Sequence, residues 1–359
     1  MSIWHTCTAR RQPGSGLRTS SSARCASLAR CASLALCASL ALALVPKPLR
    51  AEAATALAQR TGFFFDTVIT LSLYDTDDEA ILDACFEKMN YYEQTFSRTI
   101  EGSDIWNVNH SGGEATSVSE DTIDIVTQAL YYCELSDGAL DITIAPVVDL
   151  WDFRPEGDPV LPDADDIAEA LTHVGREQVE VDEEAGTIRL ADPEAEIDLG
   201  AIAKGYISAS LREILLENGC KSALIDLGGN IVAVGAKPDG TDWKIGIRRP
   251  FGTSAYDIIT AVAVSDQAVI TSGTYERYFE LDGKLYHHIL DTETGMSVEN
   301  GLSSVTIVTS NATQGDALST ACFALGLEDG LALIESLEDA EALFIDEDGN
   351  MTASSGWPG

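Results

Sequence analysis

The sequence lacks most of the short patterns that identify common enzyme classes. No two cysteines stand at C-x-x-C spacing, which argues against a zinc knuckle or a thioredoxin-like redox site. Gly228-Gly229-Asn230 has neither a Walker lysine nor G-x-G-x-x-G spacing, so neither a P-loop nor a Rossmann dinucleotide site is indicated. G-x-S-x-G and H-E-x-x-H are also missing, which leaves serine hydrolases and zinc peptidases without their residues.

Positive charge is also scarce. The chain has 22 Lys and Arg against 58 Asp and Glu, for a formal net charge of −36. The first 50 residues contain seven of the Lys and Arg and none of the Asp and Glu, so the remainder is more acidic still. A surface of this charge repels nucleic acid, and we expect no nucleic acid partner. Binding of an anion such as a pyrophosphate would need a cation or a metal at the site.

The N-terminal segment follows the pattern of a secretory signal. Arginines precede an apolar run over residues 34–45, and Ala51-Glu52-Ala53 is a candidate cleavage site with small residues. We therefore predict that residues 1–53 are a signal peptide, with an uncleaved signal anchor as the alternative, because the apolar run is short for a membrane span. An exported protein, periplasmic or otherwise extracytoplasmic, is expected, with membrane anchoring if the segment is retained.

A lipoprotein signal is a second alternative for this segment. Leu34-Ala35-Leu36-Cys37 loosely matches a lipoprotein cleavage box in which Cys37 would be acylated. The sequence Cys-Ala-Ser-Leu-Ala, however, occurs three times, beginning at Cys25, Cys31 and Cys37. A plain signal peptide or anchor is therefore favoured over lipidation.

After the leader, apolar periodicity predicts a mixed α+β domain. Residues 77–96, 122–135, 163–171, 316–325 and 328–334 have helical spacing, and Cys85, Cys133 and Cys322 fall on the apolar faces as core residues. Asp282-Gly283 between two apolar runs predicts a β-hairpin. With no repeat or linker, we predict a single compact α+β domain over residues 62–346, largely antiparallel sheet with packed helices, and a short tail over 347–359. Strands are expected at 63–73, 179–181, 187–190, 195–199, 223–227, 231–234, 243–247, 258–264, 268–271, 278–281, 304–308 and 342–345.

Residues 198–205, Asp-Leu-Gly-Ala-Ile-Ala-Lys-Gly, place an acid, a small-residue turn and a lysine between a predicted strand and a predicted helix. Exposed backbone groups at such a corner favour anionic ligands. Other segments are similarly rich in acidic, small and hydroxyl residues: Phe65-Asp66-Thr67, residues 136–143, 227–230 and 286–291, and Asp316 to Thr320. Taken in this order, these motifs resemble the ApbE family of flavin transferases, which move FMN from FAD onto a threonine of a target protein. The resemblance runs from about Gly62 to about Leu343.

Asp316 and Thr320 are four residues apart, so their oxygens lie on one face of the predicted helix and could converge on a hard cation such as Mg²⁺. From the residues alone, helix capping by Asp316 is the favoured interpretation, because an Asp at a helix start can satisfy free N–H groups. The resemblance implies that Asp316, Thr320 and the backbone carbonyl of Ala201 are metal ligands. It also implies contacts with FAD by Phe65, Thr99, Ala139, Leu140, Asp141, Asp198, Lys204 and Leu290.

His287 and His288 are adjacent on a predicted strand, so one side chain should face the site and the other should face away from it. The pattern of the family selects His288 as the functional one. The resemblance implies that His288 and Asp316 are catalytic. His288 would assist deprotonation of the acceptor hydroxyl or orient the reactive phosphate.

The resemblance as a whole implies a Mg²⁺-dependent FAD:protein FMN transferase. A threonine hydroxyl would attack the FMN-side phosphorus of FAD, AMP would leave, and a phosphoester would hold the flavin. The partners would be FAD and an acceptor flavoprotein with a target threonine, a membrane or extracellular electron carrier. Two alternatives remain open: a FAD pyrophosphatase that gives FMN and AMP, and a non-catalytic FAD-binding lipoprotein.

Overall fold

The computed structural model describes residues 54–153, 160–254 and 256–359. The predicted signal segment over residues 1–53, with Cys37 and the whole apolar run, lies outside these residues. The chain divides into two units, Met1–Glu52 and Ala53–Gly359. The fold described below is that of the second unit.

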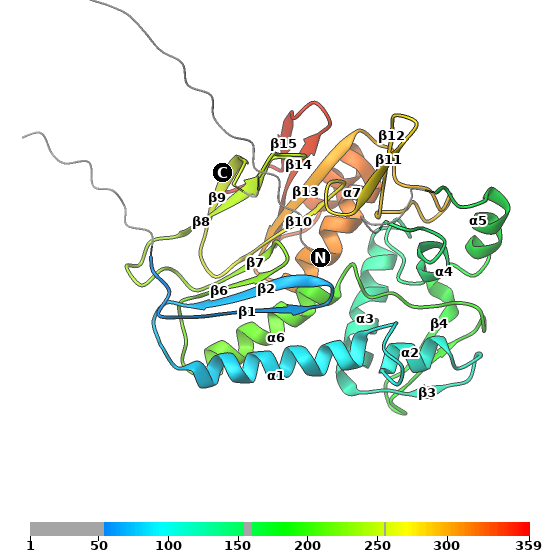
Figure 1. Ribbon diagram of the computed structural model, residues 1–359, viewed down its shortest axis with the longest axis horizontal. Coiled ribbons are helices and arrows are strands. Elements are labelled where there is room, and N and C mark those ends of the chain that lie inside the picture. Colours follow the sequence, from blue (N-terminus) through cyan, green and yellow to red (C-terminus); the bar gives the residue numbers. More distant parts are fainter. Residues whose placement is uncertain (1–53, 154–159, 255) are drawn as a thin grey trace, which may run out of the picture. The chain divides into compact units, whose positions relative to one another are not determined.

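One large antiparallel sheet organises the unit (Figure 1). Its strand order is β1-β2-β6-β7-β10-β13-β14-β15, and every pair of neighbours is antiparallel. Three small sheets join it: β11-β12, β3-β5-β4 and β8-β9. The strands are β1 (Ala58–Phe64), β2 (Thr67–Leu73), β3 (Thr116–Ser117), β4 (Val179–Asp182), β5 (Thr187–Leu190), β6 (Ala223–Leu227), β7 (Asn230–Val234), β8 (Trp243–Arg248), β9 (Ile258–Val264), β10 (Ala268–Gly273), β11 (Tyr278–Leu281), β12 (Lys284–His287), β13 (Leu302–Thr309), β14 (Ala340–Asp346) and β15 (Met351–Ala353).

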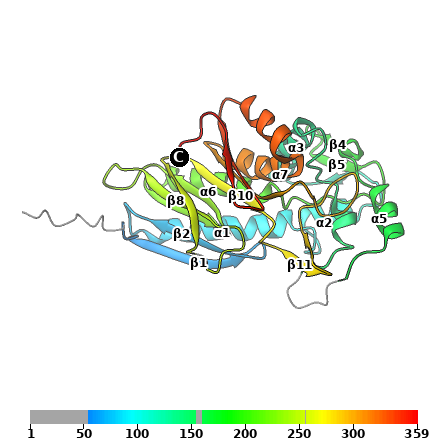
Figure 2. The same cartoon turned by 90° about the horizontal axis from the view of Figure 1, so that it is seen from above.

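Helices α1, α6 and α7 cover one face of the large sheet. In both ribbon views α1 and α6 run along β1, β2 and β6 (Figures 1 and 2), and α7 packs against β10, β13 and β14. α7 is long and apolar enough to span a membrane, but this is weak evidence because half of its most apolar stretch is buried. The helices are α1 (Glu79–Phe96), α2 (Asp104–Asn109), α3 (Glu120–Leu135), α4 (Ala145–Val148), α5 (Ala164–Leu171), α6 (Ala203–Glu217) and α7 (Ala312–Glu335), with a 3₁₀ turn at Arg176–Gln178.

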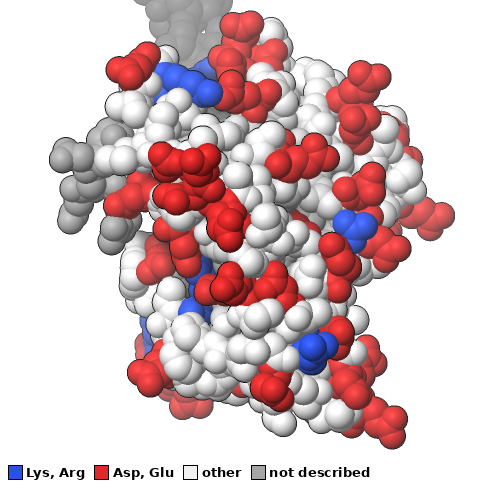
Figure 3. All heavy atoms as spheres, turned by 90° about the vertical axis from the view of Figure 1, so that its right-hand side faces the viewer, with Lys and Arg blue, Asp and Glu red and all other residues white. Residues whose placement is uncertain are grey.

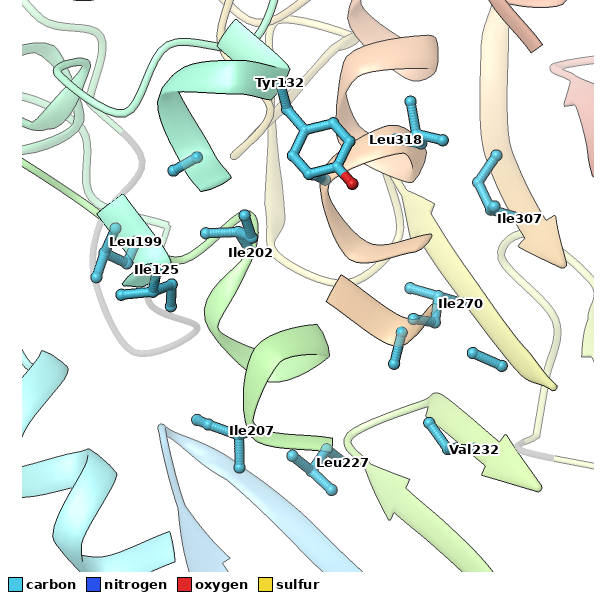
Figure 4. Packing of buried hydrophobic residues seen from close by; sticks show 14 of the residues in the cluster. Ile125, Tyr132, Leu199, Ile202, Ile207, Leu227, Val232, Ile270, Ile307 and Leu318 are labelled. Carbon is cyan, nitrogen blue, oxygen red and sulfur yellow. The ribbon is translucent and has the colours of Figure 1, made fainter. Parts of the chain in front are cut away.

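The main core lies between these helices and the sheet. Figure 4 shows Ile202 and Ile207, from the start of α6, among side chains of α3, α7 and the strands. Both are fully buried, and so are Ile270 of β10 and Ile307 of β13. The opposite face of β10 and β13 carries Val269 and Val308, which pack against the β8-β9 hairpin. Successive residues of a strand point to opposite faces, so the central strands are covered on both sides.

The structure confirms the predicted α+β fold with a large antiparallel sheet. The hairpin signal Asp282-Gly283 joins β11 to β12, and the two residues have φ of +52° and +79°. The single strand expected over 63–73 is wrong, because Phe65 and Asp66 form a two-residue turn between β1 and β2 with φ of +52° and +57°. Phe rarely adopts positive φ, and Asp66 is not followed by the glycine of an Asp-Gly hairpin signal, so the sequence does not mark this turn.

Two other elements differ from the prediction. Residues 195–199 form no strand but a single parallel bridge between Glu196 and Ile144. The break between the two helices expected near the C-terminus is confirmed, because Gly326 has a non-helical φ of +82°, but the first of these helices begins earlier, at Ala312. In the segment expected to be a tail, β15 pairs with β14.

The four cysteines of the described residues, Cys85, Cys133, Cys220 and Cys322, are buried and unpaired. Burial raises the pKa of each thiol to about 12. The thiols therefore stay protonated at neutral pH, and a thiol is a poor nucleophile. The prediction that Cys85, Cys133 and Cys322 are core residues is confirmed.

Helices α6 and α7 approach each other closely at Gly205. A Cβ at this position would lie 2.3 Å from the carbonyl oxygen of Ala312 and 2.7 Å from Cβ of Asp316. We predict that Gly205→Ala lowers the free energy of unfolding by about 1–3 kcal/mol, because backbone must move to relieve the overlap. Urea titration would measure this. Glu217→Ala, at an exposed position of α6, should stay within about 0.5 kcal/mol of the parent; equal stability of both variants would contradict the prediction.

Candidate functional site

Asp316 is a buried carboxylate at the contact between α6 and α7. It lies in the second turn of α7 and is 3% exposed. Its Oδ2 accepts the N–H of Gly205 at 2.9 Å, and its Oδ1 accepts Nδ2 of Asn230 at 2.7 Å. Lys204 places Nζ 3.5 Å from Oδ1. The cap of α7 is Asn311, so Asp316 does not cap its own helix; instead it accepts a free N–H in the first turn of α6.

The carbonyl of Ala201 lies just before α6 and has no partner in that helix. α6 begins at Ala203 after the cap Ile202, so the N–H of Gly205 is one of the free donors of the first turn, and the first intrahelical bond runs from the N–H of Tyr206 to the carbonyl of Ile202 at 3.1 Å. Asp316 accepts the N–H of Gly205, and the carbonyl of Ala201 accepts no hydrogen bond within the part of the chain that the structure describes. A carbonyl with free lone pairs beside a carboxylate is suited to a cation.

Thr320 follows Asp316 by one helical turn and lies against β10. Its Oγ1 is 3.1 Å from Oγ of Ser272, which is also 2.7 Å from Oγ of the fully buried Ser319. Ser319 in turn donates to the carbonyl of Asp316 at 2.9 Å. These hydroxyls fix the rotamer of Thr320. Sequence reasoning missed Ser272, since a lone serine at the end of a strand carries no signal.

Together, Asp316, Ala201 and Thr320 offer one carboxylate, one carbonyl and one hydroxyl oxygen. Such hard oxygen donors suit Mg²⁺ better than a soft metal. Residues 54–153, 160–254 and 256–359 contain no group of three or more His, Cys, Asp and Glu placed to hold a metal. A Mg²⁺ site with one protein carboxylate leaves positions for water and phosphate oxygens, as is usual for this ion.

The two predicted dinucleotide segments lie side by side. The N–H of Asp198 donates to the carbonyl of Ile142 at 2.7 Å, next to the bridge between Glu196 and Ile144. This pairing brings the loop with Ala139 and Leu140 alongside the turn that begins at Asp198. Segments about 60 residues apart in the sequence thus form one surface.

Asp141 is almost buried and its oxygens are already engaged. Oδ1 accepts the N–H and the hydroxyl of Thr143 at 2.8 and 2.6 Å, and Oδ2 accepts the N–H of Arg176 at 2.9 Å. The carboxylate therefore ties the loop with Ala139 and Leu140 to the segment after α5. This geometry indicates that Asp141 supports the loop, and its own contact with FAD stays a prediction.

Asp198 is paired with Arg98, a residue that sequence reasoning missed. Oδ2 lies 3.0 Å from Nε of Arg98, while Oδ1 accepts the N–H of Gly200 at 2.7 Å. Arg98 follows the end of α1 and precedes the predicted contact Thr99, which is exposed and bonded to Ser97 at 3.2 Å. Arg98 and Asp198 are far apart in the sequence, so the sequence gave no indication of their ion pair.

The two adjacent histidines have different environments. His287 is 4% exposed, with Nε2 3.0 Å from the carbonyl of Val298 and Nδ1 3.3 Å from the N–H of Ile289, so it is a neutral core residue with the proton on Nε2. His288 is half-buried, and its Nδ1 is 3.3 Å from the carbonyl of Arg277. With Nδ1 donating, the free lone pair of His288 is on Nε2.

The electrostatic environment of His288 favours its neutral form. Desolvation lowers the pKa of His288 to about 3, and the positive charges of Arg277 and Lys204 lower it further. Desolvation also raises the pKa of Glu276, an effect opposed by the charges of Lys204, Arg248 and Arg277. The sequence did not predict either effect.

Leu290 and Phe65, two further predicted FAD contacts, are both apolar residues. Leu290 is 7% exposed and packs with Trp151 and Tyr286 in a separate cluster, so only its backbone is free for a ligand. Phe65 holds its positive φ in the β1-β2 turn, and its N–H donates to Oε1 of Glu93 at 2.9 Å. Strained backbone of this kind often marks functional positions.

Comparison with known proteins gives one consistent result. A family model described as "ApbE family" matches residues 65–344. A FAD:protein FMN transferase of Klebsiella pneumoniae is 37% identical over 288 residues, which is 80% of this chain and 88% of that protein. One from Treponema pallidum is 36% identical over 293 residues, covering 77% and 80%.

Solved structures agree with the sequence comparisons. The ApbE protein of Thermotoga maritima superimposes with a TM-score of 0.76 at 33% identity, covering 83% of this chain and 97% of that one. The flavin transferase ApbE of Vibrio cholerae gives a TM-score of 0.72 at 28% identity with the same coverage.

We predict that the imidazole of His288 stays neutral down to about pH 4. Its pKa is about 3 in the folded protein and about 6.5 in an unfolded chain. Between these values the unfolded state binds more protons, so His288 makes stability fall as the pH drops through this window. Histidine ¹⁵N chemical shifts would show this, assigned with His288→Gln.

His173 is the internal control for that titration. Its pKa is raised, chiefly by the hydrogen bond to Asp192 at 2.7 Å. Its imidazole should therefore remain charged above pH 6.5, and its contribution to stability should be lost only as the pH rises through the raised pKa. Titration of His288 near pH 6.5 would contradict the burial described for it.

Proposed function

Because this chain belongs to the ApbE family, we propose that it is a FAD:protein FMN transferase. The observation that carries the proposal is the contact between α6 and α7. There, the carboxylate of Asp316 accepts the free N–H of Gly205 in the first turn of α6, Nζ of Lys204 lies 3.5 Å from its Oδ1, and the carbonyl of Ala201 just before that helix accepts no hydrogen bond from the described residues. This arrangement suits a cation and a pyrophosphate bound together.

We propose that Asp316, Thr320 and the carbonyl of Ala201 hold Mg²⁺. Each oxygen of Asp316 accepts a single hydrogen bond, so the carboxylate keeps lone pairs for a cation. When bound there, Mg²⁺ would neutralise charge on the pyrophosphate of FAD as AMP departs. Lys204 supplies a second positive charge from the first turn of α6, where helix N–H groups also favour an anion.

The protein residues then have distinct tasks in the transfer. The turn at Asp198 and the loop at Ala139 and Leu140 position the dinucleotide. His288 presents the lone pair of Nε2 to the threonine hydroxyl of the acceptor. The threonine oxygen forms a bond to the FMN-side phosphorus, the bond from that phosphorus to AMP breaks, and the hydroxyl proton passes to Nε2. The anionic substrate raises the basicity of His288 from its value in the free protein.

We further propose that the protein works outside the cytoplasm. The support is the N-terminal segment, in which arginines, an apolar run and a small-residue site follow one another. The acceptor would then be an exported or membrane-bound electron carrier with an accessible threonine. Cell fractionation with and without residues 1–53 would test export; equal cytoplasmic retention of both forms would contradict it.

The transfer itself is tested by mass spectrometry. The mature protein, FAD, Mg²⁺ and a candidate acceptor with a target threonine should give an acceptor heavier by one FMN, with release of AMP. The gain should vanish when the acceptor threonine is changed to valine, or when a chelator removes the metal. Accumulation of free FMN and AMP without labelled acceptor would instead indicate a FAD pyrophosphatase. Intact, tightly held FAD would indicate a binding protein.

Asp316→Asn should lower the transfer rate by at least about 100-fold, because the anionic oxygen for the cation is lost and an amide faces donors of Gly205 or Asn230. Asp104→Asn is the matched control. Asp104 accepts the N–H of Ser119 and the hydroxyl of Thr122 at 2.8 and 2.7 Å, in a structural contact between α2 and α3. The Asp104→Asn variant should lose stability but keep its transfer activity. Equal transfer rates for Asp316→Asn and Asp104→Asn would contradict the assignment of Asp316.

A further inference from the structure

Arg98 is the meeting point of three carboxylates. Nη2 lies 2.5 Å from Oδ1 of Asp149, Nε lies 3.0 Å from Oδ2 of Asp198, and Nη1 lies 3.9 Å from Oε2 of Glu196. The side chain of Arg98 is 19% exposed. Its planar guanidinium is the side chain that can serve several carboxylates at once in a fixed geometry.

The three carboxylates come from both sides of the predicted dinucleotide surface. Asp149 follows α4, which begins four residues after Asp141, while Glu196 and Asp198 precede the turn that leads into α6. Arg98 itself directly follows the cap of α1. One guanidinium therefore joins the end of α1 to the Asp198 turn and to the end of α4, the helix that follows the loop of Ala139 and Leu140.

The contact with Asp198 reaches the turn itself. Asp198 uses Oδ2 for Arg98 and Oδ1 for the N–H of Gly200, so fixing one oxygen fixes the other. The turn from 198 to 202 carries the free carbonyl of Ala201 and leads directly to Lys204. Without Arg98, Asp198 could rotate toward solvent and release the N–H of Gly200.

Charge gives Arg98 a second effect. It is a cation shared by three carboxylates in a chain with 22 Lys and Arg against 58 Asp and Glu. Figure 3 shows a face of the molecule on which acidic side chains greatly outnumber basic ones. Glu196 has a raised pKa, first because of desolvation and then because of the charge of Asp149, so the carboxylates repel one another. Removing Arg98 would leave them uncompensated beside an anionic substrate.

We propose that Arg98 is a positioning residue for FAD, which holds the Asp198 turn in the shape that receives the pyrophosphate and offsets the charge of Asp149, Glu196 and Asp198. This inference rests on the proposed function for its ligand. It adds a residue that touches neither the proposed metal nor the reacting phosphorus.

The test is a titration of FAD with the mature protein in the presence of Mg²⁺ and without any acceptor. Quenching of the flavin fluorescence reports binding and gives the Kd. Arg98→Ala should raise the Kd for FAD by about 10- to 100-fold, the usual effect of removing a residue that orients a binding group. Arg98→Lys keeps the charge but not the planar fork, so its Kd should lie between those of the parent and of Arg98→Ala.

A double variant separates the effect of charge from the effect of geometry. Asp149→Asn in the Arg98→Ala background removes one of the uncompensated charges and should recover part of the affinity. In transfer assays, Arg98→Ala should raise the KM for FAD while the kcat and the KM for the acceptor stay within about threefold, because Arg98 acts on binding and not on the chemical step. A purely structural defect would lower the amount of active protein and leave the KM unchanged.

Arg60→Ala is the matched control. Arg60 pairs with Asp83 at 2.5 Å and Glu79 at 3.4 Å, and its side chain is 29% exposed. Those carboxylates stand at the opposite end of α1, so the control removes a comparable arginine about 25 Å away along the helix. Its Kd for FAD should equal that of the parent.

The outcomes are distinct. If the parent protein binds FAD but labels no acceptor, the proposed transferase function is contradicted. The Kd of Arg98→Ala for FAD, compared with that of the parent, still decides the role of Arg98. A folded Arg98→Ala with the Kd of the parent would overturn the inference alone. If Arg98→Ala does not fold, Arg98→Lys decides, and a Kd equal to that of the parent would overturn it. A parent that binds no FAD would overturn both.

Discussion

A buried carboxylate at a helix crossing is the constraint on which the site depends. Asp316 is 3% exposed and lies where α6 and α7 approach so closely that only glycine fits at position 205. An ionised group in such a place must be compensated, and the N–H of Gly205, the amide of Asn230 and the ammonium of Lys204 do so. The carbonyl of Ala201 precedes the first turn of α6 and accepts no hydrogen bond from the described residues, so a fixed carboxylate and a free carbonyl flank the start of this helix.

This crossing is rigid because the elements around it are buried. Ile202 and Ile207 secure the start of α6 in the core, and Leu318 does the same for α7 (Figure 4). Asn230 begins β7, next to the tight turn at Gly228 and Gly229, so the central sheet supplies the third side. Ligands held on such elements keep their geometry without bound metal, which reduces the cost of assembling the site when substrate arrives.

The acidity of the chain explains why its few cations matter. An anionic dinucleotide meets unfavourable potential over most of such a surface, so attraction has to come from single well-placed groups. Lys204 provides one beside Asp316, and Arg98 keeps three further carboxylates from opposing it. The balance of charge at the site is thus set by contacts between segments that are distant in the sequence.

The periodic elements were predictable from the sequence, since alternation and helical spacing reflect burial directly. β5, β6, β9 and β11 have the bounds that the pattern predicts, and Asp282-Gly283 marked its hairpin. The turn at Phe65 and Asp66 was not predictable, because Phe rarely adopts positive φ and no glycine follows Asp66 to complete a usual hairpin signal. Asp316 and Thr320 could be paired by their spacing, whereas Arg98 and Ser272 are brought to the site only by tertiary contacts. Asp141 was singled out by its motif, which does not reveal that its oxygens serve the loop that holds it.

The central claim is that the crossing of α6 and α7 binds the metal together with the pyrophosphate of FAD. A crystal structure of the protein with FAD and Mn²⁺, with anomalous scattering to locate the metal, tests it most directly. The account predicts an anomalous peak within bonding distance of Asp316, Thr320 and the carbonyl of Ala201, and also of a phosphate oxygen of FAD. A metal or a pyrophosphate located away from this crossing would contradict it.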